Sequence, residues 1–108
     1  MREPTLYILL ALLRGPAHGY AVAKLVDELS DGRVRLTAGT LYGALDRLVD
    51  TDLIAVSGEE LVNGRRRRYY RITDQGREAA LAEVHRMRTL IRVAETVDPS
   101  ITGGAVAR

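Results

Sequence analysis

Asn63 and Gly64 form the strongest turn signal in this sequence of 108 residues, and they constrain its fold more than any other pair. Both residues tolerate the positive φ angles of a tight turn, so an Asn-Gly pair between two strand-like segments predicts a β-hairpin. We expect the first strand at residues 53–58 and the return strand at residues 66–72, with residues 59–65 connecting them. The chain should therefore contain an antiparallel two-stranded ribbon.

The return strand carries most of the positive charge of the chain. Residues 65–71 read RRRRYYR and hold five arginines, whereas the formal net charge of the whole chain is +2, which leaves −3 for the remainder. A compact cationic strand after a tight turn is suited to binding a polyanion, of which nucleic acid is the most common. The alternative is a solvated hairpin edge, where arginines prevent aggregation between strands.

Three helical segments precede the hairpin. The first has Pro4 in its first turn and ends at Gly15, the second is expected at residues 20–29, and the third at residues 38–49 after the N-cap residue Thr37. Apolar residues recur in each segment at helical spacing. In the third segment they share one face, which leaves the opposite face free to contact a partner. That apolar face holds Leu41, Ala44, Leu45, Leu48 and Val49.

A long helix should follow the hairpin, from residue 74 to residue 97, with Thr73 as its N-cap. Its apolar residues step by four and three, a heptad-like stripe. A helix of about 24 residues spans roughly 36 Å, more than a small domain can cover. We therefore expect its far end to pack on the same helix of a second copy, the alternative being a helix folded back on its own domain. Residues 98–108 are expected to form a disordered tail.

The order of these elements is that of a winged helix-turn-helix. The sequence thus predicts a mainly α fold with a small β-hairpin: residues 1–73 form the DNA-binding domain, residues 74–97 the dimerisation helix and residues 98–108 the tail. In such a module the third helix enters the major groove of DNA, about 12 Å wide, and the hairpin, or wing, reaches the backbone or the neighbouring minor groove.

Several classes of protein do not fit the composition. The chain has no cysteine, and therefore neither disulfides nor a thiolate zinc site, and no run approaches the roughly 20 apolar residues of a membrane span. No signal peptide is recognisable, so we expect a cytoplasmic protein. The only histidines, His18 and His85, have no metal-binding cluster around them. Without a catalytic constellation or a cofactor motif, an enzyme is not expected.

Three segments together resemble the PadR family of bacterial transcriptional regulators. They are residues 15–20 (GPAHGY), residues 36–48 (LTAGTLYGALDRL) and residues 64–73 (GRRRRYYRIT) with Gly76, and the resemblance covers about residues 4–80. The single C-terminal helix is similar to the compact branch of that family. Two residues depart from the usual pattern: Asp52 stands where many relatives have glycine, and Asp46 where a basic residue is frequent. We expect Asp46 to pair with Lys24 or an arginine, or to accept a hydrogen bond from cytosine.

We expect the DNA-binding residues on three elements. Tyr20 opens the second helix, whose N-terminus favours phosphate. For Tyr20 and Tyr42 the alternative is structural packing, with Tyr42 lying on the wing or on the second helix. Strand alternation sends Arg66 and Arg68 to one face of the wing and Arg67 and Tyr69 to the other, with Tyr69 expected to be buried. The complete set is Tyr20, Thr37, Gly39, Thr40, Tyr42, Gly43, Arg47, Arg65, Arg66, Arg67 and Arg68.

The family resemblance also implies a homodimer, a palindromic operator and control by a small hydrophobic or phenolic ligand near the dimer interface. For the ligand we expect Tyr7, Met87 and Leu90. The interface residues expected on the first and last helices are Leu6, Leu9, Leu10, Leu13, Ala80, Val84, Met87, Leu90, Ile91, Ala94 and Val97.

The function expected from these patterns is sequence-specific DNA binding as a transcriptional regulator, most simply a repressor. The alternative is a winged module that binds another protein and not DNA. The basic wing argues against that alternative, since such a module has no need of five clustered arginines.

Overall fold

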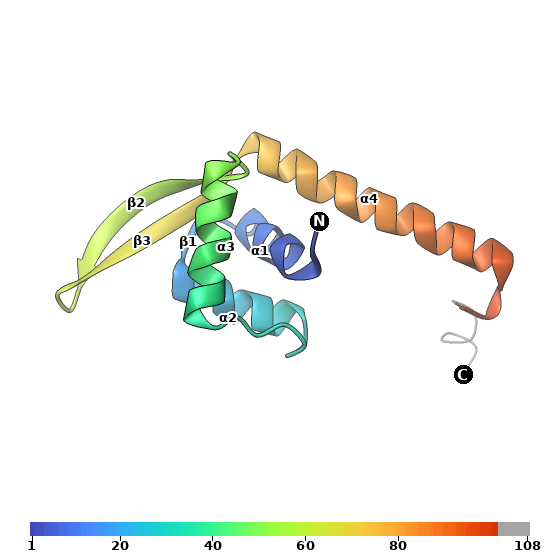
Figure 1. The fold of residues 1–108 in the computed structure, drawn as a ribbon, viewed down its shortest axis with the longest axis horizontal. Coiled ribbons are helices and arrows are strands. Elements are labelled where there is room, and N and C mark those ends of the chain that lie inside the picture. Colours follow the sequence, from blue (N-terminus) through green and yellow to red (C-terminus); the bar gives the residue numbers. More distant parts are fainter. Residues whose placement is uncertain (102–108) are drawn as a thin grey trace.

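The computed structural model describes residues 1–101, which form four helices and a three-stranded antiparallel sheet (Figure 1). This is the winged helix-turn-helix predicted from the sequence, with element boundaries within a few residues of expectation except at the first strand of the wing. The elements in chain order are α1 (Glu3–Leu13), β1 (Ala17–His18), α2 (Gly19–Leu29), α3 (Ala38–Asp50), β2 (Ile54–Val62), β3 (Arg65–Ile72) and α4 (Asp74–Val97).

The sheet contains one strand that the sequence did not indicate and one that is longer than expected. Its order is β1-β3-β2, and the two-residue β1 pairs with β3 through Ala17 and His18. Strand β2 continues to Val62 instead of ending at residue 58, because cross-strand hydrogen bonds to β3 persist to the turn. The turn itself is limited to Asn63 and Gly64, whose φ angles of 53° and 77° confirm the predicted geometry.

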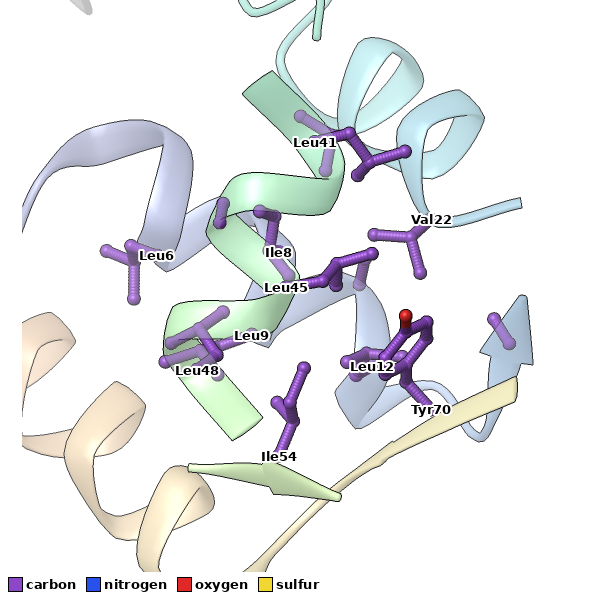
Figure 2. Close-up of a cluster of buried hydrophobic side chains, with 14 of the residues drawn as sticks. Leu6, Ile8, Leu9, Leu12, Val22, Leu41, Leu45, Leu48, Ile54 and Tyr70 are labelled. Carbon is purple, nitrogen blue, oxygen red and sulfur yellow. The ribbon is translucent and has the colours of Figure 1, made fainter. Parts of the chain in front are cut away.

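Helix α1 lies at the centre of the core (Figure 2), between α2, α3 and the base of the sheet. Leu6 and Leu9 are buried within one chain and pack in its core. The prediction that they lie at the dimer interface is therefore wrong. Each fully buried aliphatic side chain contributes about 1.5–3 kcal/mol to stability. The core residues with the largest buried side chains are Ile8, Leu9, Leu12, Val22, Val26, Leu41, Leu45, Ile54 and Tyr70.

Asp52 ends α3 in the left-handed conformation, with φ of 63°. The Leu53 amide donates to the Leu48 carbonyl at 3.0 Å and the Asp52 amide donates to Val49 at 3.0 Å, which is a Schellman ending. The Asp52 carbonyl in turn accepts the Thr73 hydroxyl at 2.6 Å. An aspartate therefore fills the position where many relatives have glycine without changing the fold.

Helix α4 projects away from the body of the molecule (Figure 1). Only Gly76 and Ala80 are buried along its 24 residues. Beyond it, the Ser100 amide and hydroxyl donate to the Asp98 carboxylate at 3.0 and 2.7 Å, so residues 98–101 form a hydrogen-bonded turn, contrary to the expectation of a disordered tail from residue 98. The rest of that expected tail, residues 102–108, lies outside the described residues.

Candidate nucleic-acid interface

The exposed face of α3 carries the residues expected to read DNA. Thr37 caps the helix: its hydroxyl oxygen accepts from the Thr40 amide at 3.4 Å, and its hydroxyl donates to Thr40 Oγ1 at 3.0 Å. Gly39, Thr40 and Arg47 are exposed, and Gly43 is half-buried. Because the buried side of α3 holds four apolar residues, this polar face is left turned toward solvent.

The N-terminus of α2 lies next to α3. His18 is its N-cap, and His18 Nδ1 accepts the Ala21 amide at 3.2 Å. Tyr20 is 65% exposed, so it does not pack under the helix turn. Tyr42 of α3 packs against Gly19, as the alternative interpretation held, but it remains 37% exposed and can still contact a ligand.

The wing arginines divide between its two faces as the alternation predicts. Arg65, Arg66 and Arg68 are exposed and Arg67 is half-buried. Glu59 on the facing strand forms ion pairs with both Arg66 and Arg68. All four arginines remain within reach of solvent, and part of their charge is balanced within the wing.

The tyrosines of the wing are reversed relative to expectation. Tyr70 is 2% exposed and lies in the core, whereas Tyr69 is half-buried and its hydroxyl donates to Glu60 Oε1 at 2.6 Å. The reason is the period of two along β3: Ile72 packs against the core, so Tyr70 faces inward and Tyr69 outward. The hydrogen bond to Glu60 raises the pKa of Tyr69.

These three elements enclose one concave groove of about 700 Å³. The wing forms one wall, and the start of α2 with Tyr42 and Asp46 of α3 forms the other. Five residues expected to bind DNA do not line this groove: Thr37, Gly39, Thr40, Gly43 and Arg47. Arginine and tyrosine side chains thus converge on a single cavity. The lining residues are His18, Gly19, Tyr20, Tyr42, Asp46, Val62, Asn63, Arg65, Arg66, Arg67, Arg68 and Tyr70.

Asp46 is the carboxylate of this groove, and its expected pairing with Lys24 or an arginine was wrong. Within residues 1–101 the Asp46 carboxylate has no cationic group within ion-pair distance. Burial raises the pKa of Tyr70 and the Arg68 charge lowers it. The negative charge of Asp46 also raises the pKa of Tyr70. Asp46 is thus free to accept a hydrogen bond from a ligand in the groove.

Six residues of the groove were not among those predicted to bind DNA: His18, Gly19, Asp46, Val62, Asn63 and Tyr70. The sequence analysis included Gly19 only in the motif at residues 15–20. Its role, to leave space for the side chain of Tyr42 from α3, follows from the tertiary structure. His18 is fixed by its cap bond and by an edge-on contact with the Tyr69 ring, with centroids 5.5 Å apart. Burial and then the Arg67 charge lower the pKa of His18, while Glu60 raises it. The sequence around His18 does not indicate that this histidine caps α2 or that it contacts the Tyr69 ring.

The residues expected at a dimer interface fall into three groups. Leu6, Leu9 and Ala80 are buried in the core of one chain, which corrects their assignment to the interface. A second group, on α1 and α4, is half-buried: Leu10, Leu13, Val84 and Ala94. A third group is exposed along α4: Met87, Leu90, Ile91 and Val97.

The three residues expected to bind an effector are not gathered in one cavity. Tyr7 is half-buried on α1, where its hydroxyl accepts from Arg33 Nη2 at 3.2 Å. Met87 and Leu90 are exposed on α4, and none of the three lines the groove described above. The part of the chain that the structure describes contains no grouping of side chains able to hold a metal ion.

None of the four helices described combines the length and the apolar character of a bilayer-spanning segment.

Comparison with known proteins identifies what this arrangement is similar to. A family model described as the transcriptional regulator PadR-like family matches residues 8–82. The transcriptional regulator Rv3488 of Mycobacterium tuberculosis is 44% identical over 81 residues, which cover 75% of this chain and 71% of that protein. An uncharacterized 37.1 kDa protein in transposon TN4556 of Streptomyces fradiae is 38% identical over 98 residues. This chain spans 27% of the length of that protein.

The fold also matches a solved structure that contains DNA. Bacillus subtilis PadR in complex with operator DNA is similar with a TM-score of 0.68 over 77% of this chain and 47% of that chain. The two sequences are 20% identical, so the similarity concerns the fold.

Proposed function

Since this chain belongs to the PadR-like family of transcriptional regulators, we propose that it acts as a homodimeric repressor that binds a palindromic operator. It is a DNA-binding regulator and not an enzyme. The observation that carries the proposal is the single groove in which Tyr42 and Asp46 of α3, the N-terminus of α2 and the arginines of the wing converge, next to the exposed residues Thr40 and Arg47 of α3. We place its action in the cytoplasm, where bacterial DNA is found.

In the proposed complex α3 enters the major groove. Thr40 and Arg47 lie on its exposed side and are suited to base edges, while Gly39 leaves open space for the backbone to approach. A Cβ at Gly39 would have no neighbour within 4 Å. Residues 1–73 form the DNA-binding domain in this proposal.

The other two elements bind phosphate. His18, Gly19 and Tyr20 at the N-terminus of α2 line the groove, and a helix N-terminus favours an anion. Arg65 and Arg66 follow the turn at the tip of the wing. Phosphate contacts of this kind position the protein on any duplex, and base contacts from α3 then select the sequence.

The dimer is proposed to form along α4, residues 74–97. Beyond Ala80 the apolar residues of this helix have little cover in one chain, and Leu90 is 63% exposed. An exposed apolar stripe of this length is unusual for a protein that functions as a single copy. A two-fold axis through α4 would place two copies of α3 about 34 Å apart, one turn of DNA, which requires a palindromic site.

The proposal includes release of the operator by a small hydrophobic or phenolic ligand. The half-buried Tyr7 and the exposed Met87 and Leu90 are candidates only if the second copy brings them together. The test is to measure the melting temperature and the DNA affinity with saturating phenolic compounds. If neither quantity changes, this ligand class is excluded.

The central test is to select duplexes from a random pool with the purified protein and to sequence them. A palindromic motif bound by two copies, with the mass of the complex measured in parallel, is the expected result. A half-site bound by one copy would contradict the proposed dimer. If no sequence is enriched, the alternative of a protein-interaction module is favoured. Leu90→Asp should separate the copies without unfolding them, since the Leu90 side chain is exposed.

A further inference from the structure

We propose that Glu59 is an internal competitor of DNA. Its carboxylate occupies Arg66 and Arg68 in the free protein and releases them to phosphate when a duplex binds. The inference rests on the DNA binding proposed above and adds a residue that sets how tightly the wing binds any sequence.

The geometry of one carboxylate between two arginines carries the proposal. Glu59 Oε1 is 3.4 Å from Arg66 Nε, and Glu59 Oε2 is 3.5 Å from Arg68 Nε. The side chains are 39% exposed for Glu59, 73% for Arg66 and 47% for Arg68, so a phosphate can reach both arginines. Both arginines therefore share one carboxylate in the free protein, and both are side chains that the proposed function assigns to DNA.

A bulge in β2 creates this arrangement. The register of β2 against β3 shifts between Val56 and Gly58, which leaves Ser57 as the extra residue. Glu59 consequently stands opposite Arg68, on the face that also carries Arg66. Without the extra residue Glu59 would be turned to the opposite face, because a slip of one residue inverts every side chain of a strand.

Arg66 and Arg68, which share this face with Glu59, both line the groove beside α3, whereas Glu59 itself does not line it. Arg68 follows the same alternation as the buried Tyr70, and its charge lowers the pKa of that tyrosine, on which Asp46 and Tyr42 of α3 also act. Glu60 lies on the other face, where its carboxylate accepts the Tyr69 hydroxyl at 2.6 Å. The two neighbouring glutamates therefore have different surroundings.

The ion pairs are weak enough to be exchanged. A charge-assisted hydrogen bond between a guanidinium and an oxyanion is about 2.7–2.9 Å long, shorter than either pair of Glu59. Exposed pairs of this type add little stability. A duplex presents one phosphate charge per about 1.7 Å of its axis, so it supplies a denser anion than one carboxylate.

The experiment compares Glu59→Gln with Glu60→Gln, two variants with the same change in net charge. Affinity for a random-sequence duplex is measured by fluorescence anisotropy between about 50 and 200 mM salt. Glu59→Gln should bind about three- to tenfold more tightly at low salt, because two exposed pairs no longer compete with phosphate. The magnitude of its salt slope should rise by up to about 0.9.

Glu60→Gln should show less than half of that gain, and the sequence preferred in a selection should be unchanged in both variants. Glu59→Ala provides a second variant with the same expected direction. Equal gains in the two glutamine variants would reduce the effect to net charge and overturn the proposal, as would a Glu59 variant that binds no more tightly than wild type. Wild-type protein that binds no duplex at any salt would overturn the proposed function as well.

Discussion

The phenol ring of Tyr42 lies directly against the backbone of Gly19. A Cβ added to Gly19 would be 2.6 Å from Tyr42 Oη and 2.9 Å from Tyr42 Cζ, closer than side chains approach. The absence of a side chain at the start of α2 therefore determines where a phenol of α3 rests in the groove.

Gly19→Ala should displace Tyr42 and weaken DNA binding. The Tyr42 ring is partly exposed and can rotate away, so the melting temperature should change by only a few degrees. The loss in affinity should match one hydrogen bond, about 0.5–1.5 kcal/mol. The measurement is an anisotropy titration with the selected operator, together with a thermal melt.

A double-mutant cycle separates this effect from a general distortion. Tyr42→Phe and the double variant should lose about as much affinity as Gly19→Ala alone, because all three remove the same phenol contact. Additive losses would mean that Gly19 and Tyr42 act independently.

Gly76→Ala should destabilise the fold although alanine favours helices. A Cβ at Gly76 would overlap the Leu53 carbonyl oxygen, a backbone atom that also accepts the Thr73 amide at 3.1 Å. Overpacking of this type costs about 1–3 kcal/mol. We expect the melting temperature to fall by about 5–15 °C.

Gly39→Ala is the matched control for that melt. It is also in the first turn of a helix, and its Cβ would meet no atom within 4 Å. Its stability should stay the same or rise by up to about 1 kcal/mol. A drop as large as that of Gly76→Ala would show that the first turns simply do not tolerate alanine.

His18 should make the stability of the protein depend on pH. Its pKa in the folded state lies below 6.5, because burial and the Arg67 charge oppose the protonated form. The unfolded chain therefore takes up a proton first as the pH falls, so the stabilising contribution is complete above pH 6.5 and is lost below it. Protonation of Nδ1 would also break the bond from the Ala21 amide.

Urea unfolding at pH 7.5 and pH 5.5 checks this expectation. The free energy of unfolding should be lower at pH 5.5 for wild type, and the difference should shrink in His18→Asn, since asparagine is also a good N-cap but does not titrate. An unchanged pH dependence in His18→Asn would assign it to other groups.

The wing and α3 should respond differently to substitution. Replacing Arg65 and Arg66 by alanine should weaken binding to all duplexes and reduce the magnitude of the salt slope by about 0.9 per lost phosphate contact. Thr40→Ala or Arg47→Ala should instead relax the preferred sequence, by about 1–3 kcal/mol per base contact. Selection from a random pool at two salt concentrations distinguishes the two. If the Arg65 and Arg66 double variant binds like wild type at every salt concentration, the assignment of both arginines to the DNA interface is wrong.

Local patterns predicted the elements of the fold because each depends on residues close in sequence. The cap at Thr37, the turn at Asn63 and Gly64, and the apolar face of α3 all appear in the structure as expected. The strand β1 was not predicted because two residues are too few to show the alternation of a strand. Their pairing with Tyr69 and Tyr70 depends on a segment about fifty positions away in the sequence.

The candidate site was predicted in part. The exposed positions on α3 and in the wing were found, since charge and helical periodicity mark them. The reversal of Tyr69 and Tyr70 was not, because alternation reveals that two neighbours face opposite ways but not which of them faces the core. The bulge at Ser57, which turns Glu59 toward Arg66 and Arg68, likewise has no signal in the local sequence.

By itself, then, the order of residues determined the helices, the hairpin and the concentration of positive charge on one strand, all of which follow from short-range backbone and side-chain preferences. Tertiary structure alone decided that Leu6 and Leu9 belong to the core, that Tyr42 rests on Gly19, that Asp46 lines the groove, and that Glu59 lies between Arg66 and Arg68. The reason is that burial and electrostatic pairing depend on which surfaces meet, and the surfaces that meet here come from elements far apart in the chain.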